Sequence, residues 1–296
     1  MTPTLPKIIF FGTEEHSLGT LKALVEHGTE IAAVITKPDA PRGRGHKLTQ
    51  PPVKEFATAH NIPVWQPNKL IEIIDDVSQL QPVAGVLVAY GKIIPQRVID
   101  LFNPGIINLH PSLLPKWRGP SPIEATIANQ DTETGISIMQ LEAGMDSGPV
   151  YIQKTVPLSG NESKLDLYNS LFSLGNQTLI NFLPDILSGK LMPTPQDDQQ
   201  ATYCSLLSKE MSQLNPETMT AAEANAHVRA HLGFPRSRLQ LNDNSLIITQ
   251  AHVSPLAEHD LSIKFKDGQF LTVDELIAPS GKTMAAKAYL NGLNTR

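Results

Sequence analysis

The sequence predicts an α/β fold: a Rossmann-like, mostly parallel sheet with helices on both faces, followed by a smaller, OB-like C-terminal β-barrel. Short and almost wholly apolar runs, such as 31–35 and 83–89, alternate with segments whose leucines recur at helical spacing. Strands buried on both faces are typical of parallel sheets covered by helices. After about residue 205 the pattern changes to short runs separated by turn residues, which is typical of a small barrel.

The length and the apolar content allow two domains. A chain of 296 residues with a hydrophobic fraction of 41% can bury two sizeable cores. Residues 191–201 are polar and contain prolines, as linkers do. We therefore expect a first domain over 1–190, a linker over 191–205 and a second domain over 206–296.

The elements of the first domain are expected from local patterns. Residues 7–13 form an apolar run that ends in Gly12-Thr13, and residues 17–27 then carry leucines at helical spacing. The same reasoning predicts further strands at 31–35, 83–89, 105–109, 134–141 and 150–156, a short helix at 120–129 and a long helix at 163–187.

The tail is expected to begin with a helix at 220–231, and strands follow at 245–249, 261–265 and 269–273. Its basic and acidic residues are equal in number. A nucleic-acid contact there would need a local patch, and Arg229, Arg236 and Arg238 are the candidates.

Composition excludes several classes of protein. The chain has 24 basic and 29 acidic residues, so its net charge of -5 gives no general affinity for nucleic acid. Cys204 is the only cysteine, which excludes an internal disulfide and a cysteine-based zinc site. No H-E-x-x-H motif and no long apolar run occurs, so we expect no metal, no membrane contact and a cytoplasmic protein.

The turn at Gly12-Thr13 joins the first strand to the first helix, where backbone N–H groups can receive an anion. It matches neither the G-x-G-x-x-G fingerprint nor the Walker A loop, because Gly12 and Gly19 are too far apart. A bound dinucleotide is therefore not expected.

The chemistry points to Asn108 and His110. They stand at i and i+2 at the end of a predicted strand, so their side chains share one face while Leu109 takes the other. An amide donor beside an imidazole suits acyl transfer, since one group stabilises an oxyanion while the other moves a proton. Asp146, between Gly144 and Gly148, could orient the imidazole.

The surrounding run Asn-Leu-His-Pro-Ser-Leu-Leu-Pro-Lys-Trp-Arg-Gly (108–119), with 135–139 and 144–148, resembles the signature of the 10-formyltetrahydrofolate-dependent formyltransferases. The resemblance is strong over about 6–155 and weaker beyond about 205. The length and two-part layout are similar to those of the members that formylate methionyl-tRNA. The resemblance therefore implies formyl transfer from 10-formyltetrahydrofolate to the α-amino group of initiator methionyl-tRNA, for translation initiation.

The resemblance also implies roles for individual residues. His110 is expected to be the general acid/base, Asn108 the oxyanion donor and Asp146 the group that orients His110. Trp117 and Arg118 would support the cleft wall. The folate would be held by Tyr90, Gly91, Ile93, Ser112, Leu113, Leu114, Pro115, Met139 and Gly144, and the acceptor by Gly12, Thr13, Arg42, Arg44 and Lys47.

A basic loop over 37–54 is expected to be the cationic arm that holds the acceptor's phosphates. Glycines and prolines predict that residues 37–48 have no regular structure. The tail is balanced in charge, so we expect the loop to supply more of the tRNA affinity than the barrel. We expect a monomer.

Two alternatives stay open. One is a related enzyme that formylates glycinamide ribonucleotide or a sugar amine, or that hydrolyses formyltetrahydrofolate. The other is a non-catalytic protein that binds folate or RNA; the intact set of Asn108, His110 and Asp146 argues against it.

Overall fold

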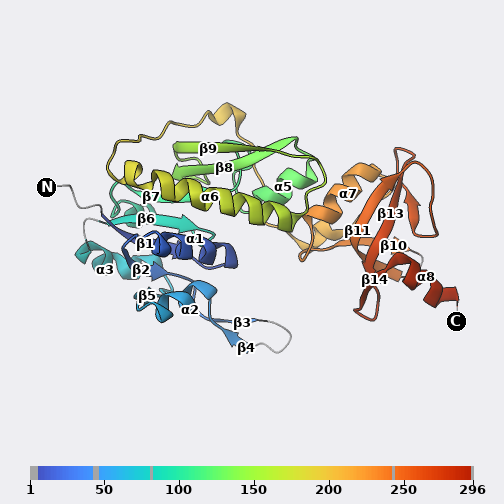
Figure 1. The fold of residues 1–296 in the computed structure, drawn as a ribbon, viewed down its shortest axis with the longest axis horizontal. Helices are drawn as coiled ribbons and strands as arrows, with labels where there is room; N and C mark the ends of the chain where they lie inside the picture. Colours follow the sequence, from blue (N-terminus) through green and yellow to red (C-terminus); the bar gives the residue numbers. More distant parts are fainter. Residues whose placement is uncertain (1–5, 43–46, 81–82, 242–243, 295–296) are drawn as a thin grey trace. The chain divides into compact units, whose positions relative to one another are not determined.

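The computed structural model describes residues 6–42, 47–80, 83–241 and 244–294. The chain divides into two compact units (Figure 1). The first consists of Met1–Pro120, Gly135–Val156 and Asn169–Tyr203, and the second of Ser121–Thr134, Pro157–Tyr168 and Cys204–Arg296. Two short segments from the middle of the chain therefore group with the tail.

The first unit is built on a seven-stranded sheet with the order β5-β2-β1-β6-β7-β8-β9. The strands from β5 to β7 run parallel, and β8 is antiparallel to β7. The predicted parallel-dominated α/β fold is confirmed, with a mixed edge. The strands are β1 (Lys7–Gly12), β2 (Ile31–Ile35), β5 (Val64–Trp65), β6 (Val83–Val88), β7 (Ile106–His110), β8 (Glu133–Gln140) and β9 (Val150–Pro157).

Helices cover both faces of this sheet. Successive residues of a strand point to opposite faces, and β1 is buried at every residue after Lys7. In β1, Ile9 and Phe11 belong to an apolar cluster that also contains Val77 and Val98 from two of the helices. Phe10 is also buried, and its ring edge lies near Gly12, where Ser17 of the first helix also packs. The helices of this unit are α1 (Glu15–Glu26), α2 (Pro52–Ala59), α3 (Ile74–Gln79), α4 (Gln96–Ile99) and α6 (Lys164–Leu187), whose first residues group with the second unit.

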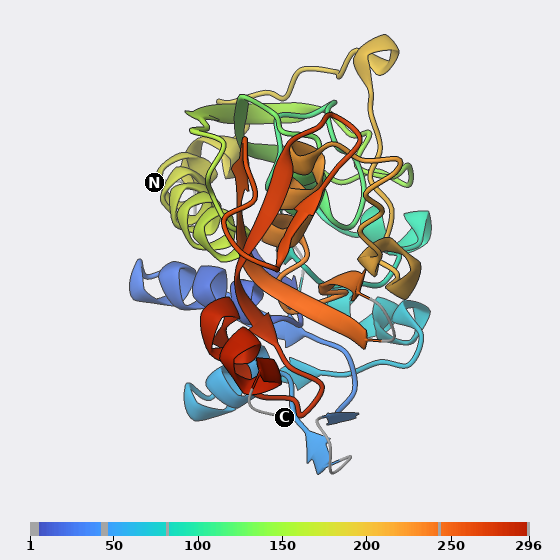
Figure 2. The same cartoon turned by 90° about the vertical axis from the view of Figure 1, so that its right-hand side faces the viewer.

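The second unit is an antiparallel half-barrel of five strands, in agreement with the predicted barrel. Figure 2 shows these strands in orange and red. Helix α7 (Ala221–Ala230), which precedes these strands, begins with a capping box between Thr220 and Glu223. The elements are α5 (Pro122–Ala128), α7 (Ala221–Ala230), β10 (Ser237–Leu241), β11 (Asn244–Ser254), β12 (Ser262–Lys264), β13 (Phe270–Ile277), β14 (Thr283–Ala285) and α8 (Ala286–Asn294).

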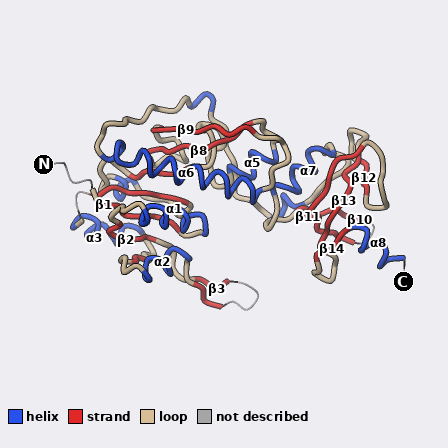
Figure 3. The backbone as a smooth tube through the Cα atoms, viewed as in Figure 1, coloured by secondary structure: helices blue, strands red, loops and turns tan. Residues whose placement is uncertain are grey.

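The expectation that residues 37–48 have no regular structure is wrong. Strands β3 (Ala40–Arg42) and β4 (Lys47–Thr49) pair as an antiparallel ribbon, on either side of residues 43–46 (Figure 3). Pro41 is tolerated because a two-stranded ribbon consists only of edge strands, on which a missing N–H can face outward. Among the described residues, no helix is long and apolar enough to cross a membrane.

Candidate active site

The end of β7 presents two polar side chains from a buried strand. Asn108 and His110 are each 5% exposed, and they share one face because they are two residues apart. Leu109 faces the opposite way, toward Gly175 of α6; a Cβ atom on this glycine would lie 2.6 Å from Cδ1 of Leu109. The predicted division of faces is therefore present, with the helix closing the apolar side.

The imidazole of His110 has a polar neighbour at each nitrogen atom. Its Nε2 lies 3.0 Å from the carbonyl oxygen of Trp117. A carbonyl oxygen only accepts, so Nε2 carries the hydrogen. Nδ1 is then the unprotonated nitrogen of the neutral ring. Nδ1 lies 3.8 Å from Oδ2 of Asp146. The structure thus brings His110 and Asp146 together at the distance of a loose ion pair when the ring is protonated.

Asp146 is fixed by the main chain around it. Its Oδ2 accepts a hydrogen bond of 2.8 Å from the Gly119 N–H. The loop is tight at Gly148, where a Cβ atom would lie 2.0 Å from the carbonyl oxygen of Gln140. The carboxylate is therefore presented to His110 by a loop with little freedom.

Three non-glycine residues near these groups have left-handed backbone conformations. Their φ angles are +45° at Ala89, +58° at Trp117 and +47° at Asp146. Such conformations are unfavourable for L residues and persist where surrounding contacts impose them, often at functional sites. Two of the three carry the groups that touch His110.

The stretch predicted to line the folate side, 112–115, is braced by hydrogen bonds. Ser112 is fully buried, and its hydroxyl donates to the Lys116 carbonyl at 2.6 Å. The Leu114 N–H donates to the Ser137 hydroxyl, and the Leu114 carbonyl accepts from Gln153. Leu113 and Pro115 are half-buried. This wall is rigid, and several of its polar groups already have partners.

The other residues predicted for the folate have different environments. The Tyr90 ring is 1% exposed and packs edge-on against Phe11, and burial raises the pKa of the Tyr90 hydroxyl to about 12. Met139 is buried opposite Asn108 in the sheet. Gly144 is exposed, and Ile93 is 90% exposed. Because its ring is buried, Tyr90 has only main-chain atoms to offer a ligand.

Gly91 and the Gly12-Thr13 turn lie where β6 and β1 end. Gly91 has a φ of +70°, and a Cβ there would lie 2.4 Å from Nζ of Lys37. The Thr13 hydroxyl donates to the Tyr90 carbonyl at 3.0 Å, and its N–H donates to Ser17. Gly12 cannot carry a side chain, because a Cβ would lie 2.6 Å from Phe10 and Ser17. The turn's glycine serves close packing.

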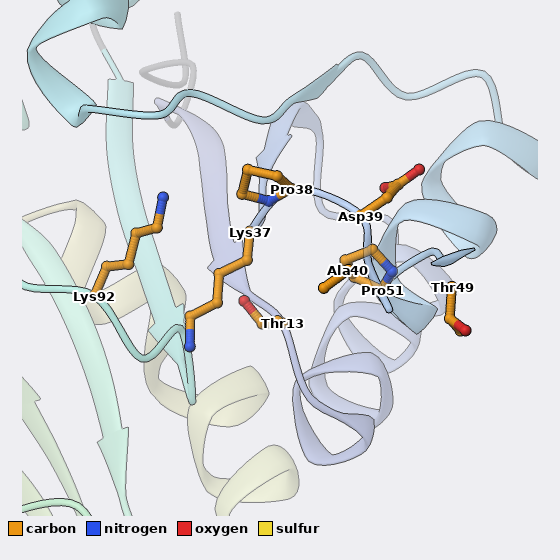
Figure 4. A pocket seen from close by; sticks show the side chains of 8 residues that line it. All are labelled: Thr13, Lys37, Pro38, Asp39, Ala40, Thr49, Pro51 and Lys92. Atoms are coloured by element: carbon orange, nitrogen blue, oxygen red, sulfur yellow. The ribbon is translucent and has the colours of Figure 1, made fainter. Parts of the chain in front are cut away.

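A pocket of about 300 Å³ lies beside this turn, within the first unit (Figure 4). Lys37 and Lys92 line it together with Thr13, while Asp39 is paired with Lys54 at 2.9 Å. The pocket therefore carries net positive charge. Its other lining residues are Pro38, Ala40, Thr49 and Pro51.

The structure describes only some of the basic residues that were predicted to hold the acceptor. Lys47 is exposed in β4. Of Arg42 only the backbone, in β3, is described, and Arg44 lies outside the described residues.

The proposed arginine patch of the tail needs a correction. Arg229 is directed inward: its Nη1 donates to the Glu162 carbonyl at 2.7 Å, and burial lowers the pKa of its guanidinium. Arg236 is exposed and Arg238 half-buried. Helical periodicity alone could not tell on which side of α7 Arg229 would lie.

Gln196 is a part of the site that the sequence did not indicate, and it binds Arg118, which was expected to support the cleft wall. Arg118 is 2% exposed and donates to Gln196 and Asp198. Gln196 stands in the predicted linker, where no spacing distinguishes it from neighbouring polar residues. Among the described residues, no group of three or more His, Cys, Asp or Glu side chains could hold a metal ion.

Comparisons with known proteins indicate the family of this chain. The model of the formyl transferase family matches residues 6–183. A methionyl-tRNA formyltransferase of Pelobacter propionicus is 35% identical over 96% of this chain and 92% of its own, and one of Halorhodospira halophila is 36% identical over 97% and 96%. Among solved structures, an N-formyltransferase of Helicobacter canadensis in complex with folinic acid and dTDP-3-aminofucose has a TM-score of 0.71 at 18% identity, covering 91% of this chain and 99% of that one.

Proposed function

The chain belongs to the formyl transferase family, among its methionyl-tRNA formyltransferases, and we propose that Asn108, His110 and Asp146 perform its reaction. The enzyme transfers a formyl group to the free α-amino group of methionyl-tRNA. One observation carries the assignment of residues: the unprotonated nitrogen of a buried imidazole lies 3.8 Å from a carboxylate that accepts a hydrogen bond from the Gly119 N–H. An amide donor lies on the same strand face.

The amine attacks the formyl carbon in its neutral form, and the reaction needs a proton acceptor because the attacking nitrogen must lose a proton as it becomes an amide. We assign that role to Nδ1 of His110, since Nε2 is bonded to the Trp117 carbonyl. Asp146 then stabilises the imidazolium that forms. The attack makes a bond between the amine nitrogen and the formyl carbon, and the carbonyl oxygen becomes an oxyanion. Asn108 would donate a hydrogen bond to it.

Collapse of this intermediate breaks the bond between the formyl carbon and N10 of the folate. The proton held by His110 passes to the leaving nitrogen, so that the ring returns to its neutral state. No net proton is consumed, and one histidine serves as base and then as acid.

We propose 10-formyltetrahydrofolate as the donor. Folinic acid occupies the related solved structure, which is support from fold similarity alone. The donor's pterin would meet main-chain groups of Tyr90, Gly91 and Ile93 and of Gly144. The braced wall of 112–115 and Met139 would exclude water from the reacting carbon.

We propose that the basic loop over 37–54 and the pocket beside it hold the acceptor. Lys37 and Lys92 supply positive charge at the pocket, and Arg42, Arg44 and Lys47 would contact the phosphates of the acceptor arm. Gly12 and Thr13 would shape the floor. We also propose that 1–190 act as the catalytic domain and 206–296 as a domain of the tRNA-binding type, joined by 191–205.

The test is a comparison of acceptors. The protein is incubated with 10-formyltetrahydrofolate and charged initiator tRNA, glycinamide ribonucleotide, an amino sugar nucleotide, or water alone. Formyl transfer to methionyl-tRNA at a kcat/KM at least about 10² above that for the other acceptors supports the proposal. Equal or faster reaction with a small amine would reject it in favour of a small-amine formyltransferase.

A further inference from the structure

We propose that Gln196 is a positioning residue of the reaction, since its side chain joins the two loops that hold His110 and Asp146. The inference rests on the proposed function of these two residues. Gln196 lies after α6, far along the chain from both.

The amide nitrogen of Gln196 binds the loop of Asp146. Its Nε2 donates to the carbonyl oxygens of Asp146 at 2.8 Å and of Gly148 at 2.6 Å. A primary amide has two N–H groups, so both are used in binding this loop. The backbone of Asp146, left-handed at φ +47°, is thereby restrained at its own carbonyl.

The amide oxygen of the same side chain binds the other loop. Oε1 of Gln196 accepts from Nε and Nη2 of Arg118, at 3.1 and 2.9 Å. Arg118 stands between Trp117, whose carbonyl accepts from His110, and Gly119, whose N–H donates to Asp146. One amide therefore determines the separation of the two loops and, through them, the spacing of His110 and Asp146.

The segment that carries Gln196 is anchored on both sides. Thr194 and Val150 exchange two backbone hydrogen bonds of 2.8 Å. Further on, the Thr202 N–H donates to the Pro115 carbonyl, and its own carbonyl accepts from the Arg118 N–H. Gln196 thus stands on a fixed support, as a positioning group requires.

Other residues cannot replace this amide. Glutamate keeps the acceptor for Arg118 but has no donor for the two carbonyls, and methionine keeps the approximate size with neither. Arg118 has further partners in Asp198 at 2.7 Å and Tyr203 at 3.3 Å. Loss of the Gln196 donors should therefore loosen the Asp146 loop while Arg118 stays in place.

The test uses Gln196→Glu and Gln196→Met, with Gln200→Ala as the matched control. Gln200 stands in the same segment and is exposed, and its side chain donates to Asp197, away from both loops. Kinetics with charged tRNA give kcat and KM, and the pH profile of kcat is recorded. Amide exchange at Gly119 is measured by NMR, because its N–H is bonded to Asp146.

We expect both Gln196 variants to lose on the order of 10²-fold in kcat, as displacement of a reacting group by about 1 Å can cause. KM should change little, and the pH profile should move. Gly119 should exchange at least about tenfold faster, and Gln200→Ala should match the wild type throughout.

An unchanged kcat or unchanged Gly119 exchange in Gln196→Glu would overturn the inference. If only Gln196→Met lost activity, the bond from Arg118, which glutamate keeps, would be the important one rather than the restraint of Asp146. That result would also overturn the inference. The exchange measurement needs no substrate, so it decides the question even if the wild-type protein formylates another amine.

Discussion

Nε2 of His110 lies 3.0 Å from the carbonyl oxygen of Trp117, a residue whose own backbone is left-handed at φ +58°. This bond decides which nitrogen can act as the base. Because the carbonyl cannot donate, Nε2 keeps its hydrogen in both the neutral and the charged ring, and the exchangeable proton belongs to Nδ1.

The first prediction concerns this tautomer. In 15N NMR at a pH where the ring is neutral, His110 should show a protonated Nε2 and an unprotonated Nδ1. Asp146→Asn should leave that tautomer unchanged, since the Trp117 bond persists, but should lower kcat because the imidazolium loses its neighbouring charge. A neutral ring protonated at Nδ1 in the wild type would contradict the assigned base.

The second prediction separates the two groups of β7. His110→Ala should lower kcat by about 10² to 10⁴. Asn108→Ala should lower it by about 10² to 10³, which is the effect of removing one oxyanion donor. Single-turnover kinetics check that chemistry limits the rate. Near wild-type turnover in either variant would remove that residue from the mechanism.

The third prediction concerns salt. Arg42, Arg44 and Lys47 replaced together by Ala should raise KM for charged tRNA and flatten the salt dependence of binding. The log-log slope should decrease by roughly 0.7 to 0.9 for each phosphate that is no longer neutralised. Folate binding should stay nearly intact. The control is Arg236→Ala with Arg238→Ala, which leaves the inward-facing Arg229 untouched. A larger decrease in affinity in that tail variant would reverse the ranking of loop over barrel.

The fourth prediction follows from two histidines of the second unit. His227, in α7, and His231, just beyond its end, have ring centroids 4.9 Å apart. Burial, with His227 and Lys164 nearby, lowers the pKa of His231 from an ordinary 6.5 to about 4. The unfolded chain therefore binds this proton at a higher pH than the folded one does.

Stability should accordingly be greatest above pH 6.5 and fall as the pH drops towards about 4. His231 alone would contribute a loss of about 3 kcal/mol over that interval. Urea unfolding at several pH values measures it, and His231→Gln should reduce the slope. His252 is the control: the carboxylates of Asp274 and Glu258 raise its pKa, so His252→Gln should not reduce the acid loss.

The fifth prediction tests the approach of α6 to β7. Gly175→Ala should destabilise the protein by about 1–3 kcal/mol, because the new methyl group meets Leu109. This outweighs the gain of about 1 kcal/mol in helix propensity. Gly19→Ala in α1, where the nearest atom to a Cβ is 3.7 Å away, should instead stabilise. Equal effects of the two changes would mean that the close approach is absent.

The local sequence was sufficient for six of the seven strands of the first unit's sheet and for the facing of β7, but it did not predict the two-residue edge strand β5. Alternation of apolar runs and helical leucines predicted the strands, and i, i+2 spacing predicted that Asn108 and His110 share a face. Both depend only on neighbours along the chain. The ribbon of β3 and β4 was missed because glycine and proline content hides pairing between three-residue strands.

Contacts between distant segments were not predictable in the same way. Gln196 stands among other glutamines and aspartates, and nothing in its neighbourhood indicates that its amide reaches Asp146 and Arg118. The grouping of 121–134 and 157–168 with the tail likewise depends on tertiary packing. Charge alone suggests a surface position for Arg229, although its guanidinium reaches a carbonyl of the second of these segments.

The position of Gln196 also limits how proteins of this plan can be cut and recombined. A fragment that ends with α6 at Leu187 would keep Asn108, His110 and Asp146, yet it would lack the amide that spaces the last two. A transplanted catalytic module, or a chimera with a foreign tail, therefore needs a junction after Tyr203. Exchange of the tail of this chain should succeed only where the crossover preserves the segment that ends at Tyr203.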